Sequence, residues 1–160
     1  MDRIPAVLFV CTGNICRSPM AEAVLRHRAR ACGLTVEADS AGTSAEEAGN
    51  PVDGRARQTL LARGYEVPER RARRVRREDF HRFDLILPAT ETHLLALERM
   101  RPRRSRPQLR LLMEYAPGLG VRDIPDPWWG DLADYEYALD LIEAAVEGLV
   151  DRLRNGLLRP

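Results

Sequence analysis

Short apolar runs alternate along the chain with segments in which apolar residues recur every three or four positions. Residues 6–10 form a continuous apolar run, which is typical of a strand buried on both faces. A helix is predicted after it, because Pro19 suits a first helical position and Gly33 suits a helix end. The same patterns predict strands over 35–39, 84–87 and 109–112, and helices over 53–62, 90–100 and 132–153.

This order of strands and helices predicts an α/β fold, with a single domain over residues 1–160. Strands that alternate with helices usually pair in parallel, so we expect a four-stranded parallel sheet flanked by helices on both faces. Such folds bind ligands beyond the carboxyl ends of their strands, where helices begin. The segment between the first strand and the first helix, residues 11–18, occupies that position.

Composition narrows the chemistry and the setting. All 25 Lys and Arg residues are arginines, which excludes reactions that need a lysine, and the net charge of +1 makes nucleic-acid binding a poor interpretation. No stretch approaches the roughly 20 apolar residues of a membrane span. The three cysteines form no even-numbered framework, and the apolar run near the start of the sequence is too short for a signal peptide. We therefore expect a cytoplasmic protein with no membrane partner.

Residues 11–18 read C-T-G-N-I-C-R-S, a C-x5-R-S motif, and we call this segment the phosphate loop. A loop of this length can curl so that its backbone N–H groups, together with the helix N-terminus, surround an anion. Gly13 and Asn14 are the residue types that most readily take the positive φ of a tight loop. The pattern therefore predicts a site for a tetrahedral oxyanion.

Three side chains of the phosphate loop carry the predicted chemistry. Arg17 offers a planar fork for two oxygens of the oxyanion. The inward N–H groups, the helix dipole and Arg17 all favour the thiolate of Cys11, which is its nucleophilic form. Ser18 can donate to that thiolate and help it leave in a second step. Cysteine phosphatase chemistry of this kind also needs an acid for the leaving group.

The best candidate for that acid is Asp126, in the segment D-I-P-D-P-W-W-G-D of residues 123–131, which we call the aspartate loop. Pro127 biases Asp126 to an extended backbone on the rim of the site. Asp123 competes with it for the role. We expect at least one of Trp128 and Trp129 to border the pocket and face a phosphoaryl ring, although both could be core aromatics.

The sequence VLFVCTGNICRSPMAEAVLR and the segments DSAGT (39–43), REDF (77–80), DLIL (84–87) and DPWWGD (126–131) resemble the low-molecular-weight protein-tyrosine-phosphatase family. The resemblance covers nearly the whole chain, in order and with small gaps. It implies removal of phosphate from phosphotyrosine in proteins through a phosphocysteine. It also implies no metal or organic cofactor, a phosphorylated protein as partner, and phosphate, sulfate or vanadate as ligand of the phosphate loop.

The resemblance assigns roles to individual residues. Cys11 is implied as nucleophile, Arg17 as phosphate binder and Asp126 as acid and then base. Hydrogen bonds from Asn14, Ser18 and Ser40 are implied to support the phosphate loop. The expected substrate-binding residues are Thr12, Gly13, Asn14, Ile15, Cys16, Ser18, Trp128 and Trp129.

Some positions depart from the family pattern and leave alternatives open. Thr90-x-x-His93 resembles the protein-arginine-phosphatase branch of the family, but that branch typically has Thr where this chain has Ile15. We give Ile15 more weight, because a bulky apolar residue crowds a guanidinium and tolerates a phenyl ring. Arsenate reductase is a third relative, but it needs two further cysteines and none follows Cys32. A phosphate-binding module without turnover would need neither the cysteine nor the acid.

Other residues have a plain structural interpretation beside a functional one. Glu46 and Glu47 stand where the family often has an aromatic residue and His, and either lie on the solvated surface or flank the pocket. Arg70 stands where the family often has His. Cys16 is a core residue or forms a reversible disulfide with Cys11.

For the remaining cysteine and the histidines, structural interpretations prevail. Cys32 is expected in the core, on the apolar stripe of its helix. His27, His81 and His93 are expected on the surface or half-buried. The arginine-rich stretches, residues 70–77 and 99–110, are interpreted as solvated faces rather than as a steering surface.

Overall fold

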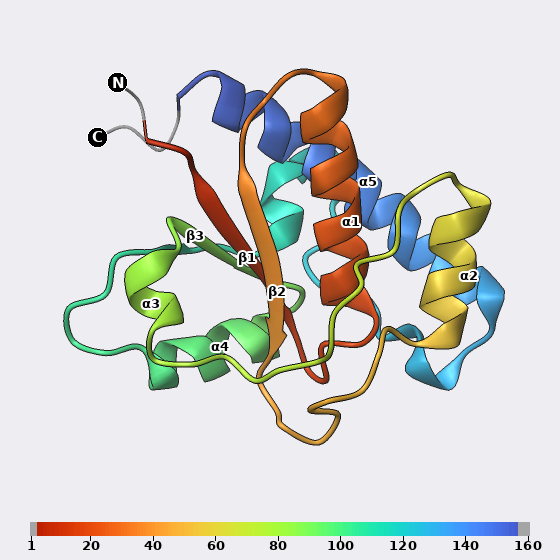
Figure 1. The fold of residues 1–160 in the computed structure, drawn as a ribbon, viewed down its shortest axis with the longest axis horizontal. Helices are drawn as coiled ribbons and strands as arrows, with labels where there is room; N and C mark the ends of the chain where they lie inside the picture. The colour runs from red at the N-terminus through yellow and green to blue at the C-terminus, as the bar shows by residue number, and fades with distance from the viewer. Residues whose placement is uncertain (1–2, 157–160) are drawn as a thin grey trace.

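The structure, a computed structural model that describes residues 3–156, is built on four parallel strands in the order β2-β1-β3-β4 (Figure 1). The strands are β1 (Ala6–Cys11), β2 (Glu37–Gly42), β3 (Leu85–Pro88) and β4 (Gln108–Leu109). β1 lies between β2 and β3, and its register with β2 runs from Ala6 opposite Glu37 to Cys11 opposite Gly42. The predicted single-domain α/β fold with a four-stranded parallel sheet is confirmed.

Helices cover both faces of the sheet (Figure 1). One face carries α1 (Arg17–Ala31) and α5 (Leu132–Arg154), with α2 (Gly54–Ala62) packed against them. The other face carries α3 (Asp79–Arg82) and α4 (Glu91–Met100). The chain reaches α5 through three short 3-10 helices, η1 (Leu112–Tyr115), η2 (Pro117–Leu119) and η3 (Pro127–Trp129).

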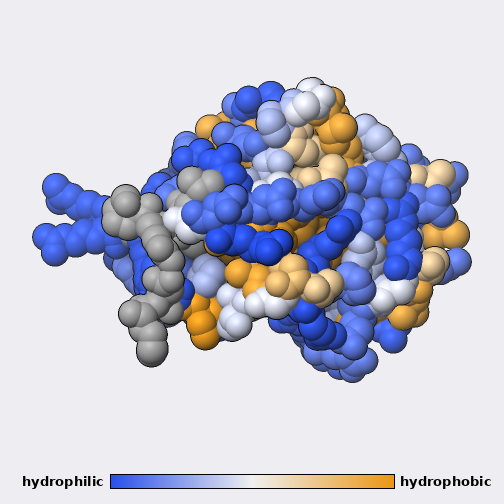
Figure 2. Space-filling model, turned by 90° about the horizontal axis from the view of Figure 1, so that it is seen from above, coloured by the Kyte–Doolittle hydropathy of each residue, from blue (hydrophilic) through white to orange (hydrophobic). Residues whose placement is uncertain are grey.

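The face of the molecule seen from above in Figure 2 is mainly polar. Figure 2 shows a face on which hydrophilic side chains dominate and hydrophobic areas are small and scattered. Within residues 3–156, no helix is both long enough and apolar enough to cross a membrane.

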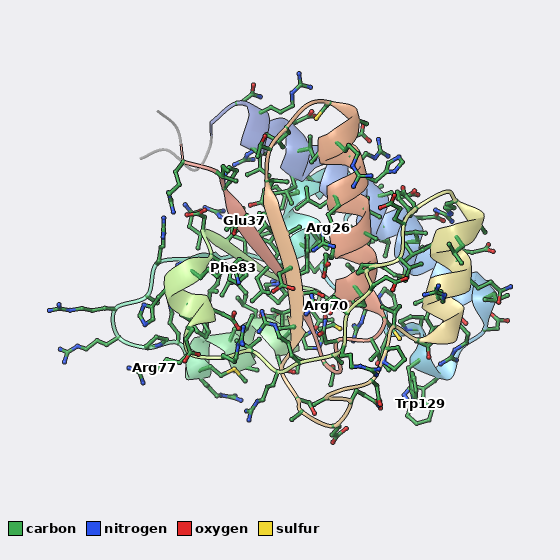
Figure 3. All side chains as sticks on the ribbon, viewed as in Figure 1. Arg26, Glu37, Arg70, Arg77, Phe83 and Trp129 are labelled. Carbon is green, nitrogen blue, oxygen red and sulfur yellow. The ribbon has the colours of Figure 1, made fainter. Side chains whose placement is uncertain are left out.

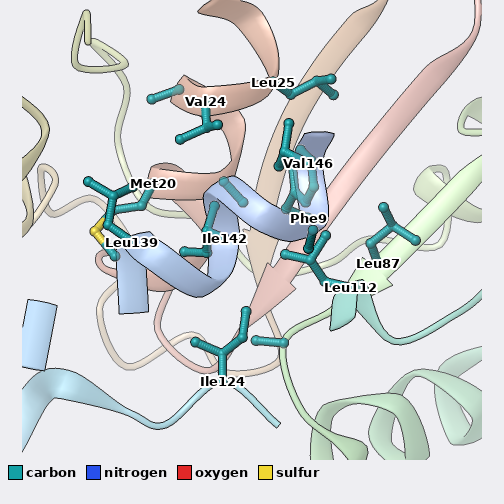
Figure 4. Packing of buried hydrophobic residues seen from close by; sticks show 14 of the residues in the cluster. Phe9, Met20, Val24, Leu25, Leu87, Leu112, Ile124, Leu139, Ile142 and Val146 are labelled. Atoms are coloured by element: carbon teal, nitrogen blue, oxygen red, sulfur yellow. The ribbon is translucent and has the colours of Figure 1, made fainter. Parts of the chain in front are cut away.

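The position of β1 inside the sheet explains why its sequence is apolar without a break. Its residues alternate between the two faces of the sheet, so each face takes every second side chain. Leu8 and Val10 pack into the smaller core beside α3 and α4, which includes Phe83 (Figure 3). Val7 and Phe9 pack into the larger core beneath α1 and α5 (Figure 4). With both faces covered by helices, no position of β1 is left for a polar residue.

Several element boundaries differ from the prediction. α1 begins at Arg17 rather than Pro19, because the Met20 N–H already donates to the Cys16 carbonyl at 3.1 Å. β2 and β4 are displaced from the predicted 35–39 and 109–112, and Leu112 belongs to η1. α3 was not predicted, since four residues are too few to show a helical period.

Two residue environments were predicted wrongly. Cys32 is exposed rather than in the core, because the buried stripe of α1 ends at Ala29 and Cys32 lies beyond the last helical turn. His93 was expected on the surface or half-buried, but only 5% of it is exposed. Its environment belongs to the site described below. His27 and His81 are exposed, as expected.

Candidate active site

The phosphate loop lies where β1 ends and α1 begins, at the carboxyl edge of the sheet. Three of its carbonyls accept backbone N–H groups from later segments: Cys11 O from Thr43, Thr12 O from Ser44 and Ile15 O from Asp53, at 2.9 to 3.1 Å. A pocket of about 250 Å³ opens against this loop. Its lining residues are Cys11, Thr12, Gly13, Ile15, Cys16, Glu46, Glu47, Asp126, Trp128 and Trp129.

Asn14 holds the phosphate loop from behind. It has a φ of 61° and only 3% of it is exposed. Its Oδ1 accepts the backbone N–H of Arg73 at 3.0 Å, which defines the orientation of the amide. Its Nδ2 therefore donates to the hydroxyls of Ser18 and Ser40, both at 2.9 Å. An asparagine suits this position because it tolerates the left-handed backbone and all its amide hydrogen-bonding groups are used.

The direction of these hydrogen bonds orients the hydroxyl of Ser18. Ser18 Oγ accepts from Asn14, so its own proton is free for another partner. Cys11 Sγ lies 3.0 Å from Ser18 Oγ. A hydroxyl that donates to sulfur stabilises the thiolate over the thiol. The arrangement thus presents Cys11 at the base of the pocket in an environment suited to a nucleophile or a leaving group.

The same chain of hydrogen bonds continues from Asn14 through Ser40 to a buried ion pair. Ser40 Oγ donates to Glu22 Oε1 at 2.8 Å, and Arg70 donates to the same oxygen at 2.7 Å. Glu22 is fully buried, and a buried carboxylate is stable only when it is paired. Arg70 also pairs with Asp39; burial opposes ionisation there, but the Arg70 charge and hydrogen bonds lower the pKa of Asp39. The sequence alone assigned no role to Arg70. In the structure it pairs with the two carboxylates at the end of the hydrogen-bond chain that supports the phosphate loop.

Arg17 links the phosphate loop to the aspartate loop. Only 5% of Arg17 is exposed. One terminal nitrogen donates to the Ile124 carbonyl at 2.8 Å, and the other lies 3.7 Å from Asp126 Oδ2. The Ile124 N–H in turn donates to the Ala89 carbonyl at 3.0 Å, just after β3. The guanidinium is thereby held between the two loops.

The two candidate acids lie in different places. Asp126 lines the pocket, precedes η3 and accepts the Trp128 N–H at 3.1 Å. Its side chain is 45% exposed. Asp123 Oδ1 instead accepts the N–H of Glu91, the first residue of α4, at 2.9 Å. Of the two, Asp126 is the one that can reach a leaving group in the pocket.

The rim of the pocket combines aromatic and acidic side chains. Trp128 is 38% exposed and Trp129 is 88% exposed, so neither is a core residue. Glu46 and Glu47 also line the pocket, and Asn50 donates to Glu47 at 2.6 Å. Both tryptophans and both glutamates thus lie where a substrate would enter.

Cys16 lines the pocket but differs chemically from Cys11. Its sulfur lies 3.4 Å from the hydroxyl of Tyr135, and both cysteines of the phosphate loop are free thiols. Burial raises the pKa of the Cys16 thiol to about 12. In this state Cys16 acts as a packing residue beside the nucleophile candidate.

His93 is a site residue that the sequence analysis missed. Its Nε2 lies 2.7 Å from Thr12 Oγ1, and its Nδ1 lies 2.9 Å from Thr90 Oγ1. Thr90 also caps α4 by accepting the His93 N–H at 3.3 Å. Burial and the charge of Arg17 lower the pKa of His93 to about 4. The Thr90-x-x-His93 spacing was the available signal, because position N3 of a helix faces its cap.

The comparisons with known proteins agree with this geometry. A model of the family described as low molecular weight phosphotyrosine protein phosphatase matches residues 6–157. This chain belongs to that family. It is 44% identical over 154 residues to a low molecular weight protein-tyrosine-phosphatase of Streptomyces coelicolor, with 93% of each chain covered.

Solved structures of the low-molecular-weight phosphatase family share the fold. A protein tyrosine phosphatase from Entamoeba histolytica is similar with a TM-score of 0.91 at 32% identity, covering 96% of this chain and 99% of that one. An arginine phosphatase of Drosophila is similar with a TM-score of 0.88 at 30% identity, covering 92% and 97%.

In this family member the predicted site residues form two layers. Thr12, Gly13, Ile15, Cys16, Trp128 and Trp129 line the pocket together with Cys11 and Asp126. Asn14, Ser18 and Ser40 support the phosphate loop from behind, where the Asn14 amide donates to both serine hydroxyls. Within residues 3–156, no group of three or more His, Cys, Asp or Glu side chains is placed to hold a metal ion.

Gly42 is predicted to be required for the shape of the phosphate loop. A Cβ at this position would lie 2.4 Å from the Thr12 carbonyl oxygen and 3.2 Å from the Asn14 nitrogen. Both are backbone atoms, so Gly42→Ala should deform the loop and weaken vanadate binding roughly tenfold or more. Gly118→Ala is the control, because nothing lies within 4 Å of its Cβ. Calorimetric titration measures the vanadate affinity of both variants. Wild-type affinity in Gly42→Ala would contradict the prediction.

His93 is predicted to make stability depend on pH. Its pKa is lowered to about 4 in the folded state, whereas an unfolded histidine titrates near its ordinary value of 6.5. Below that value the unfolded chain binds the extra proton, so the free energy of unfolding falls as pH drops, by up to about 3 kcal/mol near pH 4. Well above pH 6.5, His93 is neutral in both states and no longer lowers the free energy of unfolding.

Urea unfolding across this pH range measures the effect. His93→Gln should flatten the dependence, and His81→Gln, at an exposed position, should not. An equally steep dependence in His93→Gln would mean that other groups cause it.

Proposed function

We propose that this protein removes phosphate from phosphotyrosine in proteins. The observation that carries the proposal is the placement of Cys11 Sγ, 3.0 Å from the Ser18 hydroxyl, at the base of a pocket that Asp126 also lines. A nucleophile, a donor for its anionic form and an acid are the groups that a double displacement at phosphorus requires.

In the first step the Cys11 thiolate attacks phosphorus in line with the departing phenolic oxygen. The S–P bond forms as the P–O bond breaks, and protonated Asp126 gives its proton to the leaving oxygen. Arg17 and the inward N–H groups of the phosphate loop stabilise the charge on the equatorial oxygens. The products are tyrosine in the protein and a phosphocysteine.

In the second step a water molecule attacks the phosphocysteine. Asp126, now a carboxylate, takes a proton from the water as the O–P bond forms and the S–P bond breaks. Ser18 donates to the Cys11 thiolate and helps it leave, so inorganic phosphate departs and the starting state returns. The proposal calls for no metal and no organic cofactor.

Ile15 supports an aryl phosphate over a phosphoguanidinium. Ile15 lies in the pocket wall with only 8% of it exposed, and its apolar side chain suits a phenyl ring. The tryptophans of the rim offer further aromatic contact. Arginine-phosphatase activity is not favoured, although Thr90 and His93 resemble that branch and a Drosophila relative is named for it.

The surroundings of the pocket support two finer points. Glu46 and Glu47 disfavour substrates that carry acidic residues beside the phosphate, because like charges repel. Cys11, Cys16 and Cys32 are free thiols, which suits a reducing compartment, so we place the protein in the cytoplasm.

The roles of Cys11 and Asp126 are tested with two aryl phosphates. Cys11→Ser should abolish turnover, and wild-type turnover should not respond to a chelator. Asp126→Ala should lower kcat/KM for phenyl phosphate, a poor leaving group, by roughly 100-fold or more, and for p-nitrophenyl phosphate by much less. Asp123→Ala is the matched control and should change neither much. An equal loss on both esters in Asp126→Ala would move the acid elsewhere, and turnover in Cys11→Ser would overturn the mechanism.

The choice between phosphotyrosine and phosphoarginine is tested with paired peptides. We expect wild-type kcat/KM to favour the phosphotyrosine peptide. Ile15→Thr should reduce that preference roughly tenfold, because contacts of this size in an apolar pocket are worth 1–3 kcal/mol. A wild-type preference for phosphoarginine would show that Thr90 and His93, rather than Ile15, indicate the substrate.

A further inference from the structure

We propose that Arg55 is a positioning residue that sets where Asp126 lies relative to Cys11. Arg55 lies in the first turn of α2 and has no place in the mechanism above. Its contacts join the phosphate loop to the aspartate loop. The proposal rests on the acid role of Asp126, but part of its test is independent of that role.

Arg55 holds the aspartate loop by its backbone. Its NH1 donates to the carbonyls of Trp128, at 3.0 Å, and Gly130, at 3.3 Å. These carbonyls lie in and just after η3, the helical turn that Asp126 caps. The guanidinium also lies 5.1 Å from the ring centre of Trp128 and 4.9 Å from that of Tyr135 in α5. Hydrogen bonds and cation–π contacts thus converge on one segment.

Arg55 is connected to the phosphate loop through Asp53. Asp53 Oδ1 accepts the backbone N–H of Arg55 at 2.8 Å and its Nε at 3.2 Å, and Oδ2 accepts its NH2 at 3.3 Å. Burial opposes ionisation of Asp53, but these hydrogen bonds lower its pKa. The Asp53 N–H donates to the Ile15 carbonyl at 2.9 Å. A continuous path therefore runs from Ile15 through Asp53 and Arg55 to the aspartate loop.

Only an arginine satisfies all of these partners at once. A guanidinium has five donors in a rigid plane, so it can serve a carboxylate and two carbonyls while its face contacts aromatic rings. A lysine ammonium at the same place would lose the planar stacking and part of the hydrogen bonding. Asp126 itself is 45% exposed, so its position depends on the backbone that carries it.

Displacement of the aspartate loop has a distinctive kinetic consequence. Proton transfer falls steeply with distance, whereas the attacking sulfur of Cys11 belongs to the phosphate loop and is not carried by the segment that Arg55 holds. A loose acid therefore slows esters with poor leaving groups more than esters with good ones. A residue that only stabilised the fold would lower the active fraction and affect both esters equally.

The kinetic experiment compares kcat/KM for phenyl phosphate and p-nitrophenyl phosphate in Arg55→Lys and Arg55→Gln. We expect the loss on phenyl phosphate to exceed the loss on p-nitrophenyl phosphate roughly tenfold. Arg57→Lys, an exposed arginine of the same helix, is the matched control and should leave the ratio unchanged. Equal losses on both esters in the Arg55 variants would overturn the proposal.

A double variant tests whether Arg55 acts through Asp126. In the Asp126→Ala background, Arg55→Lys should no longer change the ratio of the two kcat/KM values, because the group that it positions is gone. If both substitutions shift the ratio additively, Arg55 acts on the reaction by another route and the proposal fails.

Fluorescence gives a measurement that does not depend on turnover. Both tryptophans of the chain lie in the aspartate loop, so a Trp129→Phe background reports on Trp128 alone. Arg55→Lys should increase acrylamide quenching of Trp128, and Arg57→Lys should not. Unchanged quenching in Arg55→Lys would show that Arg55 does not hold the aspartate loop. If Asp126→Ala does not distinguish the two esters, the acid assignment fails, and the quenching result alone decides whether Arg55 holds the loop.

Discussion

The amide of Asn14 fastens the phosphate loop to the body of the protein. An asparagine tolerates the φ of 61°, but a buried amide without partners is costly, so its place in the loop depends on every amide group being satisfied. Arg73 fixes one end of the amide, and Ser18 and Ser40 take the other. The orientation of the Ser18 hydroxyl toward Cys11 follows from that arrangement. The shape of the phosphate loop therefore depends on hydrogen bonds from within the protein.

The support behind Asn14 ends in charge. The hydroxyl of Ser40 donates a hydrogen bond to Glu22, and the fully buried carboxylate of Glu22 is paired with Arg70 and with Arg26. An arginine here keeps its charge at every pH at which proteins fold, which a histidine would not. In the sequence, the absence of lysine served only to exclude reactions that need a lysine. In the structure, Arg17, Arg55 and Arg70 are among the arginines whose guanidinium serves several acceptors together.

The two halves of the site meet because of the topology of the sheet. Parallel strands present their carboxyl ends at one edge, so the phosphate loop after β1 and the chain after β3 lie side by side. The aspartate loop is tied there by Ile124, whose N–H bonds to Ala89 and whose carbonyl accepts from Arg17. Nucleophile and acid candidates from distant parts of the chain are thus brought to one pocket.

What the sequence determined by itself was local. An unbroken apolar run specified a strand covered on both faces, and the C-x5-R-S spacing specified a loop that can surround an anion. The cap at Thr90 and the helix end at Gly33 were also legible, because these signals depend on neighbouring residues.

Only the tertiary structure decided the features that join distant residues. His93 is buried where its Nε2 meets the hydroxyl of Thr12, and Cys32 is exposed because it lies beyond the end of α1. Arg55 and Arg70 have partners far away in sequence. Side-chain spacing along one element says which residues share a face. Which element that face meets, and which donor then finds which acceptor, is settled only when the helices pack on the sheet.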